Sequence, residues 1–216
     1  MKPINDFLDA CKSAVKSVMR DIARKLNKAT GGDLSPNAVT LTGLTMHIPI
    51  ALLIAYDHPI WGALLLVVFG LFDSLDGELA RLQGTESRVG MMLDSSTDRM
   101  KEVILYVGIA YSLVSHAAST SWEPAQIAAL VAAAVGGSVL VSYINAWGEA
   151  MLSSSPHKKH AVNQTFRSGL MRFEVRMFLL IFGLLTGWLF PIVGIIAVLV
   201  WLTALERLRN VIYRLS

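Results

Sequence analysis

Four aspartates stand at the ends of two neighbouring apolar segments of the chain. Asp73 and Asp76 lie three residues apart near the end of the first segment, and Asp94 and Asp98 lie four apart near the start of the next. Both spacings place the two side chains on one face of a helix. Because the connection between the segments is short, we expect antiparallel helices whose four carboxylates converge. Charged groups in apolar spans are costly and usually functional, so this convergence predicts an active site.

Converging carboxylates need a cation, because like charges would otherwise push protons onto some of them. All-oxygen ligation suits a hard ion, so we expect Mg²⁺ or Mn²⁺, with Ca²⁺ as a competitor. Four carboxylates are enough for two ions, which together stabilise the attacking and leaving oxygens of a displacement. The alternative is that the acids form interfacial salt bridges with the neighbouring basic residues Arg81, Arg88, Arg99 and Lys101. Four acids on two facing stripes, with glycines between them, favour the metal site.

Small residues share the helix faces of the aspartates. Gly77 and Ala80 recur on the face of the first pair, and Gly90 recurs on the face of the second. A face without bulky side chains lets a large ligand approach the backbone. Arg81 adds a planar guanidinium whose geometry suits phosphate. The acids and their neighbours therefore predict a site for a phosphorylated ligand beside bound metal.

The composition places these helices in a membrane. Hydrophobic residues make up 54% of the 216 residues and charged residues 16%, against about 25% charged residues in a soluble domain. One cysteine excludes a disulfide framework and a cysteine-based zinc site. At roughly 20 residues per span, six apolar segments are long enough to cross a bilayer: about 37–56, 60–82, 90–117, 124–151, 170–187 and 191–212. We expect an all-α integral membrane protein with six transmembrane helices.

The basic residues predict how the spans are oriented. If the N-terminus is cytoplasmic and the spans alternate, all 19 Lys and Arg fall on the cytoplasmic side, within 1–36, 81–101, 158–176 and 207–214. The three opposite turns carry none, which is a one-sided case of the positive-inside rule. We therefore expect a protein of the cell membrane with both termini in the cytoplasm. Its active site should also face the cytoplasm. No nucleic-acid partner is expected.

The sequence of the N-terminal segment predicts a basic amphipathic helix. Lysines and arginines recur through residues 4–28 at near multiples of four, with apolar residues between them. This pattern favours a helix that lies on the membrane surface, and the alternative is a solvated helix packed on the rest of the protein. We divide the chain into this surface helix, 1–33, and a six-helix transmembrane catalytic domain, 34–216. The small-residue stretch 131–139 suits close helix packing, within the monomer or across a homodimer, and we expect a homodimer.

Eight of these residues resemble the full signature of the CDP-alcohol phosphotransferases. The pattern is Asp73-x2-Asp76-Gly77-x2-Ala80-Arg81-x8-Gly90-x3-Asp94-x3-Asp98. Pro36, Asn37 and Thr40 also resemble the Pro-Asn-x-x-Thr element that opens the first span in this family. The resemblance implies a phospholipid-synthesising transferase. Such an enzyme displaces CMP from a CDP-linked lipid with a second alcohol and forms a phosphodiester.

The resemblance also implies a role for each matched residue. Metal ligation falls to Asp73, Asp76, Asp94 and Asp98, and Asp98 is also the general base for the acceptor hydroxyl. The residues implied to bind the nucleotide are Asn37, Thr40, Asp73, Gly77, Ala80, Arg81 and Gly90. The donor lipid, CDP-diacylglycerol or CDP-archaeol, stays open.

Two later stretches bear on the acceptor alcohol. Residues 142–150 and 169–176 resemble the branch that uses inositol phosphate, the phosphatidylinositol-phosphate and archaetidylinositol-phosphate synthases. The expected acceptor is therefore inositol phosphate, and the arginines expected to hold its phosphate are Arg172, Arg176 and Arg207. Glycerol 3-phosphate, the acceptor of phosphatidylglycerophosphate synthases, is the alternative.

Two other classes of protein also place aspartates in membrane helices. Membrane prenyltransferases bind a diphosphate through Mg²⁺, but they lack the Asp-Gly-x-x-Ala-Arg element. A divalent-metal transporter would use the same carboxylates as its transport site. It should also carry polar residues on a path to the outer face, and the outer halves of the second and third spans have few.

Overall fold

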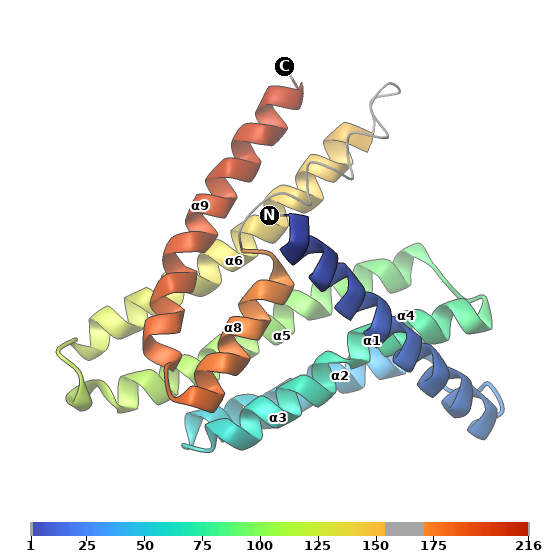
Figure 1. The fold of residues 1–216 in the computed structure, drawn as a ribbon, viewed down its shortest axis with the longest axis horizontal. Coiled ribbons are helices and arrows are strands. Elements are labelled where there is room, and N and C mark those ends of the chain that lie inside the picture. Colours follow the sequence, from blue (N-terminus) through green and yellow to red (C-terminus); the bar gives the residue numbers. More distant parts are fainter. Residues whose placement is uncertain (1, 154–170, 216) are drawn as a thin grey trace. The chain divides into compact units, whose positions relative to one another are not determined.

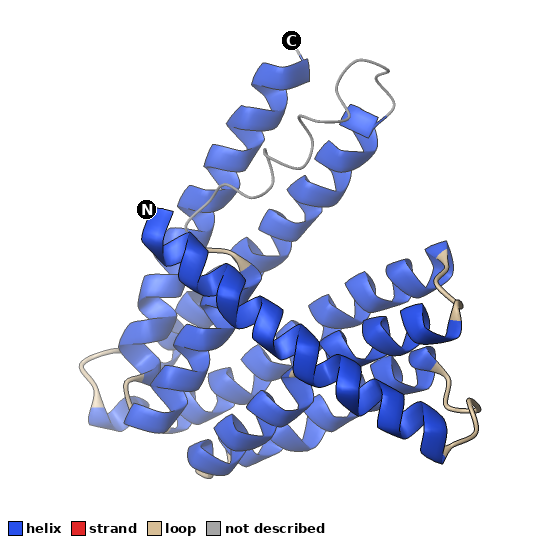
Figure 2. Cartoon of the chain, turned by 45° about the vertical axis from the view of Figure 1, so that its right-hand side comes forward, coloured by secondary structure: helices blue, strands red, loops and turns tan. Residues whose placement is uncertain are grey.

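The computed structural model describes residues 2–153 and 171–215, and the elements within these ranges are helical (Figure 2). They fall into two units. The first unit, Met1–Leu53 with Trp61–Leu105, holds α1 (Lys2–Ala29), most of α2 (Pro36–Ala55) and α3 (Pro59–Gly70), α4 (Phe72–Gln83) and the first part of α5 (Arg88–Ser115). The second unit, Ile54–Ile60 with Tyr106–Ser216, holds the rest of α5, the short η1 (Ala117–Ser119), α6 (Pro124–Ser153), α8 (Phe173–Thr186) and α9 (Leu189–Leu215), as labelled in Figure 1.

Four of the described helical segments are long and apolar enough to cross a membrane. They are Pro36–Ala55, Pro59–Gln83, Pro124–Met151 and Leu189–Arg214, and the second of them joins α3 and α4. The all-helical class and the membrane character therefore agree with the sequence. The third and fifth expected segments are helical, as α5 and α8, but neither is among these four candidate spans. Helix α5 carries the charged residues of the predicted site, and α8 has 14 residues, while residue 170 lies outside the described residues.

The ends of the helices around the predicted site follow from local sequence. Pro36 opens α2, where its fixed φ and missing N–H suit a first helical position. The backbone N–H of Ala38 donates to the carbonyl of Ser35 at 3.0 Å and starts the helical pattern. At the far end of α4, Gly84 adopts a left-handed φ of 65°, which closes the helix. Only a short connection, 84–87, then leads to α5, so the two helices that carry the aspartates form a hairpin.

The N-terminal helix α1 packs against α4. Met19 and Ala23 are buried together with Leu75 and Leu79 of α4 in a small apolar core. On the same side of the helix, Arg20 forms an ion pair with a glutamate of α4. Part of the apolar face of α1 therefore packs on protein, as in the alternative reading of this segment. Val18 stays 55% exposed, and the membrane-surface role of the helix remains a prediction.

In the second unit, α6 packs closely against α9. A Cβ atom at Gly137 would clash with Val200, so a larger residue cannot stand at this crossing without a shift. The indole N–H of Trp201 donates to the carbonyl of Ala133 at 3.0 Å, also between these two helices. The small-residue stretch 131–139 thus serves packing within the monomer.

Candidate functional site

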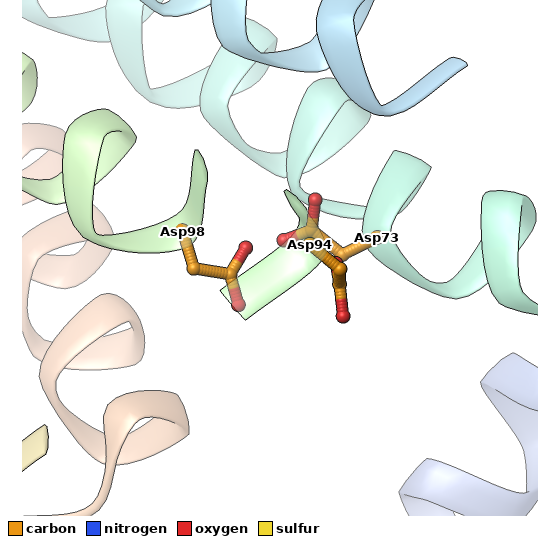
Figure 3. Close-up of side chains that lie close together, drawn as sticks. All are labelled: Asp73, Asp94 and Asp98. Atoms are coloured by element: carbon orange, nitrogen blue, oxygen red, sulfur yellow. The ribbon is translucent and has the colours of Figure 1, made fainter. Parts of the chain in front are cut away.

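Three of the predicted metal ligands meet within the first unit. Asp73 stands in the first turn of α4, and Asp94 and Asp98 stand one turn apart on α5. Each offers one carboxylate oxygen, and these oxygens lie within 4.8 Å of one another (Figure 3). The helical spacing and the short hairpin therefore produce the convergence that the sequence indicated, for three of the four acids.

The fourth acid, Asp76, is held by hydrogen bonds from its neighbours. The Thr40 hydroxyl donates to Asp76 Oδ2 at 2.6 Å, and the backbone N–H of Gly77 donates to Asp76 Oδ1 at 2.6 Å. Asp76 is buried and is not part of the three-carboxylate group. Its implied role as a metal ligand remains a prediction, and the structure adds that Thr40 of α2 orients it.

Lys101, named from the sequence only as a possible salt-bridge partner, lies within this site. Its ammonium forms ion pairs with Asp73 and, at 3.4 Å, with Asp98 Oδ1. The lysine follows Asp98 by one helical turn, a spacing that could have drawn attention to it. Part of the salt-bridge alternative is therefore present in the structure. Even so, three carboxylates against one ammonium leave the group with a formal charge of −2.

The neighbouring arginines have acidic partners of their own. Arg99 Nη1 lies 2.8 Å from Glu102 Oε2 and its Nη2 lies 4.0 Å from Asp98. Arg81 Nη1 lies 2.5 Å from Glu78, which is buried and also pairs with Arg20 of α1. The Arg81 guanidinium is still half exposed, so it can meet a ligand while its partners hold it in place.

A pocket of about 800 Å³ adjoins these acids in the first unit, a size typical of small-molecule sites. All seven residues predicted to bind the nucleotide line it: Asn37, Thr40, Asp73, Gly77, Ala80, Arg81 and Gly90. Asp76 and Asp94 line it too, so the pocket reaches the carboxylates. Residues of α2, α4 and α5, together with the connections after α1 and after α4, thus come together around one space.

Gln83 is a residue that the sequence reasoning missed. Its amide Nε2 donates to the carbonyl of Leu34 at 2.9 Å and to the side chain of Asn27 at 2.8 Å. These bonds tie the end of α4 to the connection between α1 and α2, which lines the pocket. A single glutamine at a helix end carries no spacing signal, so only the fold reveals its role.

The carboxylate group fits a hard divalent cation. Its donors are carboxylate oxygens from Asp73, Asp94 and Asp98, the ligand type that Mg²⁺ and Mn²⁺ prefer. Asp94 Oδ1 is buried and has no hydrogen-bond partner. A buried polar atom of this kind needs a partner, and a metal ion would provide one.

The arginines predicted for the acceptor phosphate lie in the second unit. Arg172 precedes α8, Arg176 stands in its first turn, and Arg207 lies on α9. Arg176 and Arg207 are buried, and Arg176 Nη1 donates to the carbonyl of Met171 at 2.8 Å. Buried arginines are rare without partners, and both side chains have polar or electrostatic partners within the protein.

Comparisons with known proteins match most of the chain. A family model described as CDP-alcohol phosphatidyltransferase matches residues 33–208. A phosphatidylinositol phosphate synthase from Corynebacterium glutamicum is 33% identical over 84% of this chain and 76% of its own length.

Two solved structures also resemble this chain over most of its length. The phosphatidylinositol phosphate synthase of Mycobacterium tuberculosis with CDP-DAG bound has a TM-score of 0.74 at 25% identity, covering 90% of this chain and 94% of that chain. The same enzyme in complex with manganese and citrate has a TM-score of 0.73 at 25% identity, covering 89% of this chain and 88% of that one. These matches favour a transferase over the metal transporter and the prenyltransferase that the carboxylates alone left open.

Proposed function

The chain belongs to the CDP-alcohol phosphatidyltransferase family, and we propose that it transfers the phosphatidyl group of a CDP-linked lipid to inositol phosphate and releases CMP. One observation carries the proposal. The seven residues expected to bind the nucleotide line a single pocket that also reaches the converging carboxylates. A CDP headgroup in this pocket would have its diphosphate beside the acids and Arg81.

Asp73, Asp76, Asp94 and Asp98 would hold the divalent metal, which we propose is a pair of Mg²⁺ or Mn²⁺ ions. When bound, such ions neutralise the diphosphate and stabilise the departing CMP. The solved manganese complex of the M. tuberculosis enzyme supports a divalent metal in this fold. The buried Asp94 oxygen without a partner supports it in this chain.

The side chains of the pocket have different roles in binding the donor. Arg81 binds a phosphate through its exposed guanidinium, while Gly77, Ala80 and Gly90 leave room for the nucleotide along the helices. Asn37 lies at the start of α2 and binds the nucleotide from that helix. Holding both reactants in place is the main requirement of phosphoryl transfer, since the reaction needs little covalent help from the protein.

Asp98 takes the proton from the acceptor. As its carboxylate accepts the hydroxyl proton, the acceptor oxygen attacks the β-phosphate of the donor. The bond from that phosphorus to the bridging oxygen of CMP breaks, and CMP leaves with the electron pair. Asp98 is partly exposed, with a side-chain exposure of 20%, so an acceptor can reach it.

Inositol phosphate is the acceptor that the relatives favour. The C. glutamicum protein that matches most of this chain is named a phosphatidylinositol phosphate synthase, and so is the M. tuberculosis structure. We propose that Arg172, Arg176 and Arg207 bind the acceptor phosphate. Glycerol 3-phosphate is the competitor that an assay must exclude.

The arrangement in the membrane follows the charges. We propose six spans in residues 34–216, with α1 within the surface segment 1–33 and both termini in the cytoplasm of a cell-membrane enzyme. The placement of all 19 basic residues on one side supports this orientation. The active site then faces the cytoplasm, where phosphorylated sugars are found, and we propose that the protein is a homodimer.

The decisive assay measures CMP release from CDP-diacylglycerol by the purified full-length protein. Inositol 1-phosphate, glycerol 3-phosphate, serine and inositol are offered as acceptors in parallel. We expect release with inositol 1-phosphate, loss of release with EDTA, and recovery with Mg²⁺ or Mn²⁺. Release with glycerol 3-phosphate alone would overturn the acceptor, and no release with any acceptor would overturn the reaction.

A further inference from the structure

Lys101 holds a buried positive charge between two of the three converging carboxylates. Its side chain is only 4% exposed, and its ammonium pairs with Asp73 and with Asp98. Asp73 lies 28 residues away on α4, so Lys101 also links the two helices of the hairpin. Charges in such a buried place interact more strongly than surface charges because water and salt screen them less.

The other basic residue next to this group is engaged elsewhere. Arg99 pairs at 2.8 Å with Glu102, a fully buried acid, and reaches Asp98 only at 4.0 Å. Asp94 Oδ1 keeps no hydrogen-bond partner. Among the described residues, Lys101 is therefore the close cationic partner of Asp73 and Asp98. These two ion pairs do not include Asp94, the third acid.

The ammonium of Lys101 bonds to oxygens that a metal ion would need. A divalent cation that binds Asp73 and Asp98 has to take those oxygens from Lys101 or share them with it. Without any cation, three partly buried carboxylates with oxygens within 4.8 Å of one another would repel one another strongly. A lysine between Asp73 and Asp98 reduces this repulsion, but it also competes with a metal ion for their oxygens.

We propose that Lys101 is a positioning residue that serves as a built-in counter-ion of the metal centre. It holds Asp73 and Asp98 together before metal arrives, and it lowers the affinity of the site for a divalent ion. This inference rests on the metal site of the proposed function. It concerns metal affinity, however, and makes no claim about the acceptor or the chemistry.

The test removes the charge of Lys101 and measures metal binding directly. Lys101→Met keeps the length of the side chain, Lys101→Gln keeps a polar donor if the methionine variant folds poorly, and Lys101→Arg keeps the charge. Lys28→Met, on the exposed end of α1, removes one positive charge from a residue that forms none of the ion pairs of the carboxylate group. The full-length proteins are stripped of metal in detergent, and free Mn²⁺ is followed by electron paramagnetic resonance during titration.

Removing the ammonium changes the formal charge of the group from −2 to −3. We expect the two neutral variants to bind Mn²⁺ at least about tenfold more tightly than the unmodified protein, the lower end of what one neighbouring charge does to an ionic equilibrium. Lys101→Arg and Lys28→Met should keep the original affinity. The metal-free neutral variants should melt at a lower temperature, and Mn²⁺ should raise their melting temperature by more than it raises that of the unmodified protein.

Each result bears on the inference. Tighter binding in both neutral variants supports it, because a lysine with a merely structural role would weaken binding when lost. Equal or weaker binding in the neutral variants overturns it and leaves the metal site intact. If neither the unmodified protein nor any variant binds Mn²⁺, the metal site itself is wrong and the inference is wrong with it.

Discussion

At the scale of residues, the four acids of the site differ in how they are held. Both oxygens of Asp76 accept hydrogen bonds, from Thr40 and from the N–H of Gly77. Asp73 and Asp98 share Lys101, whereas Asp94 has an oxygen with no partner. These differences follow from tertiary contacts and not from the identical chemistry of the side chains, and they give each acid a different sensitivity to substitution.

Asp98→Asn tests the general base. The amide has nearly the same shape but cannot accept the acceptor proton, so we expect CMP release to fall by about a hundredfold or more. Binding of CDP-diacylglycerol should persist because Asp98 does not line the nucleotide pocket. Binding is measured by equilibrium dialysis with labelled donor and turnover by CMP release. Full activity in this variant would remove Asp98 from the role of base.

Thr40→Val tests the hydrogen bond that orients Asp76. Valine has the same shape but no donor, which leaves a buried carboxylate oxygen with one partner fewer, at a cost of about 1–3 kcal/mol. We expect lower thermal stability and reduced CMP release. Thr40→Ser restores the hydroxyl and should recover most of both. Equal behaviour of the two variants would show that the hydroxyl does not matter.

At the scale of elements, one hairpin carries the acids and a second helix pair supports the other unit. The hairpin of α4 and α5 places Asp73 opposite Asp94 and Asp98, and α2 adds Thr40 from outside it. In the second unit, α6 and α9 approach closely at Gly137. The chemistry therefore depends on a short-range hairpin, whereas the second unit depends on contacts between helices far apart in the sequence.

Gly137→Ala tests the close packing of α6 and α9. The added Cβ would clash with Val200, and overpacking of this kind costs about 1–3 kcal/mol. Gly136→Ala is the matched control, since its Cβ would meet no atom within 4 Å. We expect a lower melting temperature for the first variant and an unchanged or slightly higher one for the second. Unfolding in detergent is followed by the fluorescence of a dye that does not react with thiols. A melting temperature equal in both variants would contradict the close approach.

At the scale of the whole molecule, charge is segregated along the chain. All 19 basic residues fall in four regions that alternate with apolar segments, while the turns between the other segment ends carry none. Four described helical segments meet the length and hydropathy needed to cross a membrane. This segregation is what orients the protein in our proposal, and it can be tested without any activity assay.

Cysteine labelling tests the orientation. In a Cys11→Ser background, Thr120→Cys places a thiol in the connection between η1 and α6, and Lys28→Cys places one at the end of α1. We expect a membrane-impermeant maleimide to label position 120 in intact cells and position 28 only after the cells are opened. Labelling of position 28 in intact cells would overturn the cytoplasmic N-terminus.

Much of the fold could be predicted because apolar length and helix breakers act locally. The expected segment 37–56 became α2, Pro36–Ala55, and the expected 90–117 became α5, Arg88–Ser115. The meeting of Asp73, Asp94 and Asp98 also followed from helical spacing plus one short connection.

The contacts that were not predicted join residues far apart in the sequence. Lys101, named only in the salt-bridge alternative and without a particular partner, reaches Asp73 across 28 positions, and Thr40 reaches Asp76 across 36. Periodicity states which face a side chain occupies but does not rank its possible partners on other helices. For the same reason, the packing of Met19 on α4 stood only as an alternative to a lipid contact until the fold was known.

The left-handed turn at Gly84 bears on how the protein is made. Because the turn joins α4 directly to α5, Asp73 and its partner Lys101 leave the ribosome within one short stretch of chain. The two helices can therefore form as a pair, with the acid and the ammonium already matched. During biogenesis the carboxylates then do not have to wait for a metal ion, or for the second unit to be synthesised, before part of their charge is neutralised.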